Sequence, residues 1–261
     1  MDPARRPWIQ HAGAPPAGAT LGVVVHDRRV AATYTKREGK IVEVEIWSDV
    51  VCPWCFVGKR RFEAALATFE HRDDVTVTWR SFELDPTAPR EREVDLATHL
   101  AEKYGTSREQ ALAMQKRMSE VGAGERIEFR QDIARGGSSF DAHRLLHLAA
   151  AHDRQDALKE RLMRAYHTEG EPIGDPATLE RLAVEVGLPA DEVHDVLAGD
   201  RYATEVRHDE RMAQSFGISG VPFFVVDRSL AASGAQSPEI LGELLRRGWS
   251  ARPTAAAAPQ A

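Results

Sequence analysis

The sequence predicts an α/β fold in which a β-α-β segment and a β-β-α segment form one domain, with a large all-helical domain inserted between them. Two observations favour this arrangement. Strand patterns rich in β-branched residues lie in residues 41–84 and 218–249, whereas residues 85–217 are rich in alanine, leucine, glutamate and arginine, most of which favour helices. We therefore expect residues 41–84 plus 218–249 to fold together and residues 85–217 to form the inserted domain.

The first half of the strand-containing domain is expected to be a β-α-β unit. Residues 41–47 are rich in valine and isoleucine, residues 75–82 alternate in polarity, and both patterns predict strands. Between them, apolar residues of 56–69 such as Phe62 and Leu66 recur at helical spacing. A strand, a helix and a strand in this order are typical of a parallel strand pair.

The remaining elements follow in the order that this fold requires. The inserted segment is expected to hold five or six helices, with Ser139 and Asp175 as N-caps. Strand character returns at residues 223–226, and a tight turn into residues 229–233 predicts an antiparallel hairpin. Residues 239–247, preceded by a proline, predict a last helix.

The two ends of the chain differ in composition from the rest. Residues 1–40 contain scattered prolines, glycines and basic residues and predict a disordered extension, and the Ala- and Pro-rich residues 250–261 predict a flexible tail. The longest apolar run before residue 41, Leu21–Val25, is too short for the core of a secretory signal, and no segment approaches the length of a membrane span. We therefore expect a cytoplasmic protein without membrane contact.

Charge and cysteine content argue against several functional classes. A net charge of -6 disfavours a binder of nucleic acids or anionic membranes, which needs a basic surface. The chain has two cysteines, Cys52 and Cys55, and no histidine pair of finger-like spacing behind them. A structural zinc site takes about four ligands, so no metal is expected. In a cytoplasmic protein such a close cysteine pair is more often catalytic than structural.

The segment Cys52-Pro53-Trp54-Cys55 predicts a redox-active dithiol at the start of a helix. Cys52 is expected at the helix N-terminus, where free backbone N–H groups and the helix dipole stabilise a thiolate and lower the pKa of the thiol. Pro53 suits the first helical turn because it has no N–H group. Cys55, one turn later, is expected to be more buried and to resolve a mixed disulfide formed at Cys52. The alternative is a pair of incidental core cysteines.

A second candidate feature is the proline of Gly220-Val221-Pro222-Phe223-Phe224. A proline directly before a strand is often only a loop stop or a strand starter. Its pairing with the two cysteines favours a cis bond between Val221 and Pro222, although cis is the minority form of such bonds. A cis turn would present the backbone of Val221 to an extended substrate segment beside Cys52.

These motifs together resemble the DsbA-like thioredoxin superfamily. The cysteine motif, the segment before Phe223 and the helical insertion carry the resemblance, which covers about Ile41 to Gly248. Three phrases make the chain similar to the FrnE-like branch, which is related to 2-hydroxychromene-2-carboxylate isomerases and kappa-class glutathione transferases. They are Ser48-Asp49-Val50-Val51-Cys52-Pro53-Trp54-Cys55, Phe140-Asp141-Ala142-His143-Arg144-Leu145 and Ser233-Gly234-Ala235-Gln236.

The resemblance implies a thioredoxin fold interrupted by a helical lid, with the active site between the two parts. It implies disulfide oxidoreduction or isomerisation on cytoplasmic protein or small-molecule thiols, with Cys52 as nucleophile, Cys55 as resolving thiol and Pro222 as the cis-proline. Pro53 and Trp54 would tune the redox potential. No bound cofactor is implied. Glutathione is a candidate co-substrate, and a thioredoxin- or glutathione-type reductant is a candidate partner.

The sequence departs from the family pattern at one position behind the cysteines. Many thioredoxin-fold enzymes carry a buried acid six positions before the first cysteine, where this chain has Ile46, and the neighbouring Glu45 should point to the opposite face of the strand. Deprotonation of Cys55 would then rely on Asp49, water or the substrate. Asp49 has a second interpretation, as a cap of the helix that follows.

Three further side chains each have two interpretations, and three large aromatic residues are assigned to the core. The family phrase places His143 and Arg144 at the cleft as substrate-binding residues, whereas the alternative is a packed helix with a satisfied histidine. Trp54 either contacts substrate or shields the disulfide. The large aromatic residues of the two first strands are expected in the core rather than at the site; they are Trp47, Trp79 and Phe82.

Three functions compete. The first is the thiol–disulfide oxidoreductase or isomerase described above. The second is a glutathione-dependent isomerase or transferase of the 2-hydroxychromene-2-carboxylate isomerase type, in which the position of Cys52 is typically a serine, so that the presence of both cysteines disfavours it. The third is a thiol-independent holdase whose helical part covers apolar clients.

Overall fold

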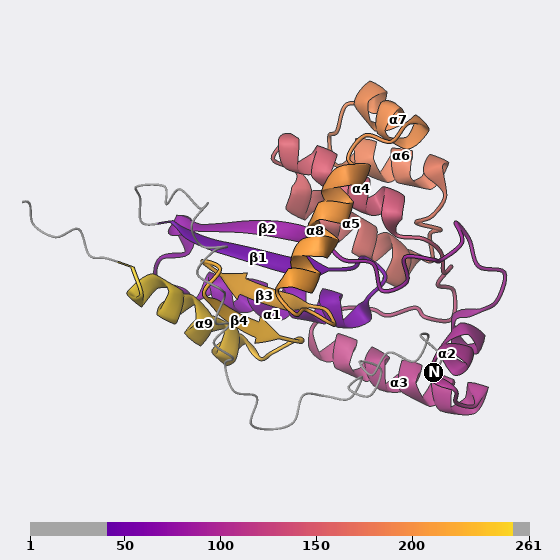
Figure 1. The fold of residues 1–261 in the computed structure, drawn as a ribbon. Helices are drawn as coiled ribbons and strands as arrows, with labels where there is room; N and C mark the ends of the chain where they lie inside the picture. The colour runs from indigo at the N-terminus through magenta and orange to yellow at the C-terminus, as the bar shows by residue number, and fades with distance from the viewer. Residues whose placement is uncertain (1–40, 253–261) are drawn as a thin grey trace, which may run out of the picture.

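The structure is a computed structural model that describes residues 41–252. Its centre is a four-stranded sheet in the order β2-β1-β3-β4 (Figure 1), formed by β1 (Val42–Ser48), β2 (Val75–Ser81), β3 (Phe223–Val226) and β4 (Leu230–Ser233). β1 pairs parallel with β2 and antiparallel with β3, which pairs antiparallel with β4. The predicted β-α-β and β-β-α segments therefore form one mixed sheet.

One face of the sheet is covered by α1 (Pro53–Ala67) and α9 (Pro238–Ser250). Alternate residues of β1 point to this face because side chains alternate along a strand, and Ile46 is fully buried there among apolar side chains of both helices. Phe62 of α1 stacks on Phe224 of β3 with ring centroids 5.7 Å apart. The predicted amphipathic helix thus provides one half of this core.

The opposite face of the sheet is covered by α8 (Ala203–Ser215) and the loop after it, as Figure 1 shows. Trp47 is fully buried on this face, where its ring meets the edge of Phe216 and its indole N–H donates to the carbonyl of Asp209 at 3.0 Å. Trp79 is buried and Phe82 half-buried, which confirms that these aromatic residues belong to the core. Glu45 also lies on this face, as expected, and binds Arg80 and Arg228.

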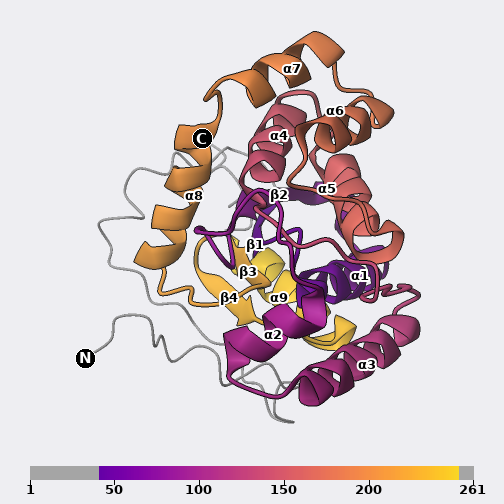
Figure 2. The same ribbon diagram turned by 90° about the vertical axis from the view of Figure 1, so that its right-hand side faces the viewer.

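The segment between β2 and β3 is helical, as predicted, but it holds more helices than the five or six expected. Within the described residues it contains seven α-helices and one π-helical turn, η4 (Ala165–Glu169). Besides α8, they are α2 (Leu96–Tyr104), α3 (Arg108–Gly124), α4 (Phe140–Ala151), α5 (Gln155–Arg164), α6 (Pro176–Glu185) and α7 (Ala190–Ala198). α4 to α7 gather around one apolar core beyond the edge strand β2, whereas α3 packs against α1 and α2 packs against α3 (Figure 2).

The predicted N-cap at Asp175 and the predicted hairpin turn are confirmed, whereas the predicted N-cap at Ser139 is wrong. Asp175 caps α6, since its carboxylate accepts from the backbone N–H of Thr178 at 2.9 Å. Ser139 was expected to cap α4 but makes no such bond; the hydroxyl of Ser138 accepts from the N–H of Phe140 instead. The hairpin turn has the positive φ angles typical of a type I′ turn, 47° at Asp227 and 50° at Arg228.

The last helix is longer than the sequence indicated. α9 runs to Ser250, three residues beyond the expected end at Arg247. Trp249 accounts for the extension, because its ring stacks on His71 with centroids 3.7 Å apart and thereby holds the final turn. The expected disordered extension 1–40 and most of the expected tail, 253–261, lie outside the described residues. In residues 41–252 no helix has the length and apolarity needed to span a membrane.

The stacked pair of Phe62 and Phe224 gives a stability prediction. Phe62 is 3% exposed, and Phe62→Ala should lower the free energy of unfolding by about 3–5 kcal/mol, as is typical of aromatic truncation in a core. The matched control is Leu112→Ala on α3, where the side chain is 44% exposed and a loss within about 0.5 kcal/mol is expected. Urea unfolding monitored by circular dichroism measures both. Equal losses in the two variants would contradict this assignment of the core.

Candidate active site

The two cysteines lie at the start of α1, directly behind the carboxyl end of β1. Cys52 is the N-cap residue with extended backbone angles, φ −88° and ψ 113°, and Pro53 occupies the first turn. The carbonyl of Cys52 accepts from the N–H groups of Cys55 at 3.0 Å and Phe56 at 3.3 Å. Both cysteines are free thiols, Cys52 with 4% of its surface exposed and Cys55 fully buried. The predicted placement of the pair is therefore observed.

The ionisation of the pair differs from the expectation of a low pKa at Cys52. Burial raises the pKa of Cys55, but the neighbouring Cys52 thiol and the charge of Lys159 outweigh it and lower the value. The pKa of Cys52 is raised, first by its hydrogen bond to Cys55 and then by burial and by the charge on Cys55. The first ionisation of the reduced pair therefore favours Cys55, and Cys52 keeps its proton.

The loop before β3, which contains Val221 and Pro222, lies against Cys52. The bond between Val221 and Pro222 is cis, which confirms the expectation from the sequence. The Cys52 thiol lies 3.8 Å from the carbonyl oxygen of Val221 and donates to it. The carbonyl of Pro222 accepts from the N–H of Gly234 at 2.8 Å, which ties this loop to the end of β4.

A close approach between α1 and this loop was not detectable from the sequence. A Cβ atom built on Gly58 would lie 2.8 Å from the Cγ atom of Pro222. Only glycine at this helical position lets the Pro222 ring approach the helix so closely. A single glycine in a helix pattern gave no indication of which neighbour required it.

Asp49 lies in the loop before Cys52 and is fully buried. Its carboxylate accepts from the backbone N–H of Leu84 at 2.8 Å and of Val51 at 3.4 Å, and it binds the His143 ring at 3.3 Å. No side chain caps α1, so the proposed capping role of Asp49 is wrong. Burial raises the pKa of Asp49, but the bonds to His143 and Leu84 and the charge of Lys159 outweigh it and lower the value.

His143 and Arg144 are adjacent on α4 but have different surroundings. His143 reaches the candidate site through Asp49, and its burial lowers the pKa of the ring in spite of that carboxylate. Arg144 points elsewhere: its guanidinium donates to the backbone carbonyls of Arg201 at 2.9 Å and Gly199 at 2.6 Å. The expectation that Arg144 faces the cleft is therefore wrong. This side chain fixes the connection between α7 and α8.

Apolar side chains from the helical segment cover the cysteine pair. Trp54 is half-buried and packs against the same cluster, which fits both interpretations of this residue. The buried members around Cys52 and Cys55 come from α1, α3 and their neighbours; they are Phe56, Val57, Met118, Ile127, Phe129, Met163 and Ala235. Tyr104, at the end of α2, is close enough that the charge of Cys52, after burial, raises the pKa of its hydroxyl.

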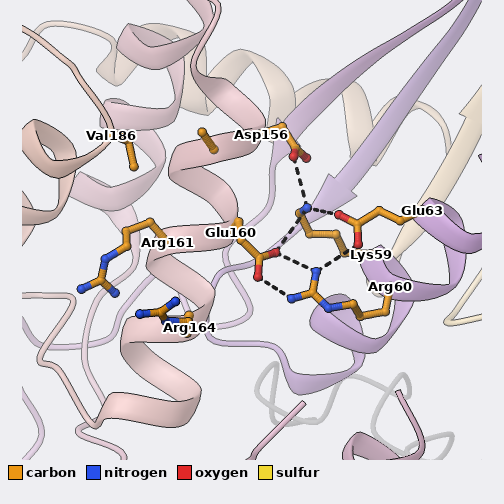
Figure 3. Close-up of a pocket in the computed structure, with 9 residues that line it drawn as sticks. Lys59, Arg60, Glu63, Asp156, Glu160, Arg161, Arg164 and Val186 are labelled. Atoms are coloured by element: carbon orange, nitrogen blue, oxygen red, sulfur yellow. Dashed lines mark hydrogen bonds and ion pairs between the residues drawn. The ribbon is translucent and has the colours of Figure 1, made fainter. Parts of the chain in front are cut away.

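A hollow of about 460 Å³ lies between α1 and α5 (Figure 3), and neither cysteine lines it. Its charged side chains pair with one another: Lys59 binds Glu63, Asp156 and Glu160, and Arg60 binds Glu63 and Glu160. This network joins the two helices. In residues 41–252 no group of three or more histidine, cysteine, aspartate or glutamate side chains is arranged to hold a metal ion.

The fold and the paired thiols define a thioredoxin-type protein with a helical insertion. The DSBA-like thioredoxin domain family matches residues 43–246, and the chain belongs to this family. The expected resemblance to the DsbA-like thioredoxin superfamily and the expected fold class are thereby confirmed.

Three known proteins illustrate the relationship. The crystal structure of a probable DsbA oxidoreductase, SCO1869 from Streptomyces coelicolor, is 45% identical, with a TM-score of 0.78 over 83% of this chain and 94% of that chain. The uncharacterized protein YwbO of Bacillus subtilis is 27% identical over 74% of this chain and 91% of its own length. A 2-hydroxychromene-2-carboxylate isomerase shares the fold at 13% identity, with a TM-score of 0.58 over 78% of this chain and 95% of that chain.

The packing of Gly58 against Pro222 gives a prediction for the site. In Gly58→Ala, the new methyl group should push the Pro222 loop away from Cys52, lower thiol exchange at least several-fold and cost about 1–3 kcal/mol of stability. The control is Gly124→Ala at the end of α3, where an added Cβ meets no atom within 4 Å. Insulin reduction and urea unfolding measure the two effects. A Gly58→Ala variant as active and stable as Gly124→Ala would contradict the close approach.

The buried Asp49 gives a pH-dependent prediction. Asp49→Asn should cost about 1.5–3 kcal/mol at neutral pH, because the carboxylate accepts charge-assisted hydrogen bonds. The folded pKa of Asp49 lies below its ordinary value, so its stabilisation is present above the unfolded pKa and is lost as pH falls through the folded pKa.

Wild type and Asp49→Asn should therefore converge in stability as the pH is lowered from about 7 to about 3. Urea unfolding across this range is the measurement. Asp73→Asn serves as the control, since that side chain is 96% exposed. A deficit in Asp49→Asn that stays constant at all pH values would show that the charge of Asp49 contributes nothing.

Proposed function

We propose that this protein is a thiol–disulfide oxidoreductase or isomerase in which Cys52 is the nucleophile and Cys55 the resolving thiol. The observation that carries the proposal is the asymmetric pair of free thiols at the start of α1, with Cys52 the more exposed of the two and within 3.8 Å of the Val221 carbonyl. Membership of the DSBA-like family supports this chemistry.

The reaction on a substrate disulfide begins at Cys52. Transfer of the Cys52 proton to the Cys55 thiolate generates a Cys52 thiolate, which attacks one substrate sulfur, forms a mixed disulfide and releases the other substrate sulfur as a thiolate. That thiolate takes up the Cys55 proton. The Cys55 thiolate then attacks the Cys52 sulfur, forms the bond between the two cysteines and releases the second substrate thiolate. The substrate gains two electrons and the dithiol loses them; the same steps in reverse oxidise a substrate dithiol.

The Val221 carbonyl gives the substrate a place to dock. It lies beside Cys52 at the end of a loop that precedes β3, and an extended substrate segment could bond to this backbone as a strand does. Trp54, half-buried beside Cys52, would border the same segment. His143 would act indirectly, through its contact with Asp49.

The proposal extends to the setting of the reaction. We place the protein in the FrnE-like branch on the three sequence phrases around Cys52, His143 and Gln236. A cytoplasmic location, expected from the sequence, favours reduction or shuffling of disulfides over net oxidation. Glutathione is the proposed small-molecule co-substrate, and a thioredoxin- or glutathione-type protein the proposed reductant.

Cysteine variants test the proposal. In insulin reduction and in refolding of scrambled ribonuclease, Cys52→Ser should lose activity at least about a thousandfold, because the nucleophile is gone. Cys55→Ser should accumulate mixed disulfides at Cys52, detectable by mass spectrometry, because no thiol resolves them. Full activity of Cys52→Ser would contradict the proposal.

The same variants separate the two competing functions. A glutathione-dependent isomerase of the type that carries serine at this position should keep its activity in Cys52→Ser. A holdase should protect an aggregating client equally well when both cysteines are replaced by serine. Either result, together with intact folding by circular dichroism, would replace the oxidoreductase proposal with the corresponding alternative.

A further inference from the structure

A buried lysine lies behind the cysteine pair, on the side where the sequence has no acid. Lys159 belongs to α5 of the helical segment and is fully buried. Its ammonium group donates to the carbonyl of Ser48 at 3.3 Å, and Ser48 is the last residue of β1, directly before the loop that leads to Cys52. The positive charge of Lys159 lowers the pKa of the Cys55 thiol. A cation therefore lies next to the resolving cysteine.

The position of Lys159 is fixed by its neighbours on α5. Gln155, one turn earlier on the same face, accepts from the backbone N–H of Trp79 and donates to its carbonyl, both at 3.0 Å. The carboxylate of Asp156 accepts from the Trp79 indole at 2.9 Å and also pairs with Lys59 of α1. Because residues four apart share a helix face, this attachment of Gln155 to the edge strand β2 directs Lys159 at the end of β1.

Lys159 differs from the other buried lysine of the described chain. Lys59 is 2% exposed and has three carboxylates within 4 Å, those of Glu63, Asp156 and Glu160. Lys159 takes part in no ion pair within residues 41–252, and its ring contact is with Trp79, at 5.5 Å from the centroid. An ammonium group that is buried without a carboxylate partner is costly, so its retention needs another anion.

The charged groups that face Lys159 identify that anion. Burial lowers the pKa of Lys159 to about 8, and the charge of Cys55 is the strongest opposing influence, followed by the charges of Asp49 and Cys52. Asp49 already has partners in His143 and in the N–H groups of Leu84 and Val51. The other titratable groups near Lys159 are Lys59, which is a cation, and His143, which becomes one when protonated. Neither can neutralise the charge of Lys159.

We propose that the buried ammonium group of Lys159 is the counter-charge of the Cys55 thiolate and takes the place of the buried acid that many thioredoxin-fold enzymes have behind this cysteine. Lys159 acts through Cys55 and is a positioning residue for charge, not a group that contacts substrate. The inference rests on the oxidoreductase function proposed above. Its consequence is thermodynamic: the counter-charge stabilises the reduced pair, which carries a thiolate, and not the disulfide, which carries none.

Replacing Lys159 by methionine removes the charge and keeps nearly the same side-chain length. In Lys159→Met the pKa of the first thiol ionisation should rise by about one unit or more, which is about tenfold less thiolate at a pH below it. In glutathione redox buffers, the equilibrium constant should shift at least about tenfold towards the disulfide, because the reduced form loses its counter-charge. Ultraviolet absorbance of the thiolate and gel shifts of alkylated protein measure these two quantities.

Lys59→Met is the matched control. It removes an equally buried ammonium group from α1, but one that is neutralised by its own three carboxylates. It should lower the stability of the fold while leaving the thiol pKa and the glutathione equilibrium within about twofold of wild type, since the charge it removes is already compensated. An equal change in both variants would show that Lys159 acts only through stability and would overturn the inference.

The outcomes separate this inference from the function on which it rests. Wild-type protein that exchanges no disulfide with glutathione or insulin would refute the oxidoreductase proposal. Wild-type protein that does exchange, with Lys159→Met unchanged in both thiol pKa and equilibrium constant, would refute only the role of Lys159.

If Lys159→Met does not fold, a measurement on the wild-type protein tests the role of Lys159. The ammonium group of Lys159 can be titrated by nitrogen-15 NMR in the dithiol form and in the disulfide form. Its pKa should be lower in the disulfide form, because oxidation removes the thiolate that holds the proton on the lysine. The same pKa in both forms would overturn the proposal.

Discussion

The structure depends on the attachment of helix α5 to Trp79 at the edge of the sheet. Three groups of Trp79 take part, since its backbone N–H and carbonyl both bond to the Gln155 side chain and its indole N–H bonds to Asp156. Gln155 thus supplies hydrogen bonds that an edge strand otherwise leaves open. Through Lys59, the same helix is also joined to α1, which carries the cysteines (Figure 3). The contacts of α5 therefore fix the position of the helical segment relative to both the sheet and the dithiol.

The order of elements and the central features of the site were predictable because their signals are local. Alternation and helical spacing in residues 41–82 mark the first three elements, and a cysteine pair before an amphipathic helix fixes the dithiol at a helix start. The cis bond before Pro222 followed from combining that motif with a proline that precedes a strand. These patterns can be recognised in the sequence without knowing which segments pack against the elements they predict.

The parts that escaped prediction depend on contacts between segments far apart in the sequence. Arg144 occurs in a phrase typical of the family, yet its guanidinium holds backbone carbonyls of residues 196–201, which no local pattern reveals. No local pattern distinguishes Gly58 from an ordinary helical glycine, because its close neighbour Pro222 is brought to it only by the fold. Lys159 resembles any charged residue of an amphipathic helix, and only its full burial distinguishes it. The lower pKa at Cys55 instead of Cys52 has the same origin, because it reflects groups brought by the folded chain.

The contact between Cys52 and the Val221 carbonyl joins residues that are 169 positions apart. All of the helices from α2 to α8 lie between them in the chain, so during synthesis both thiols leave the ribosome long before the second half of their site exists. Long-range contacts of this kind form late in folding. These 261 residues contain no third cysteine, so within them Cys52 and Cys55 have no other thiol with which to form a wrong disulfide.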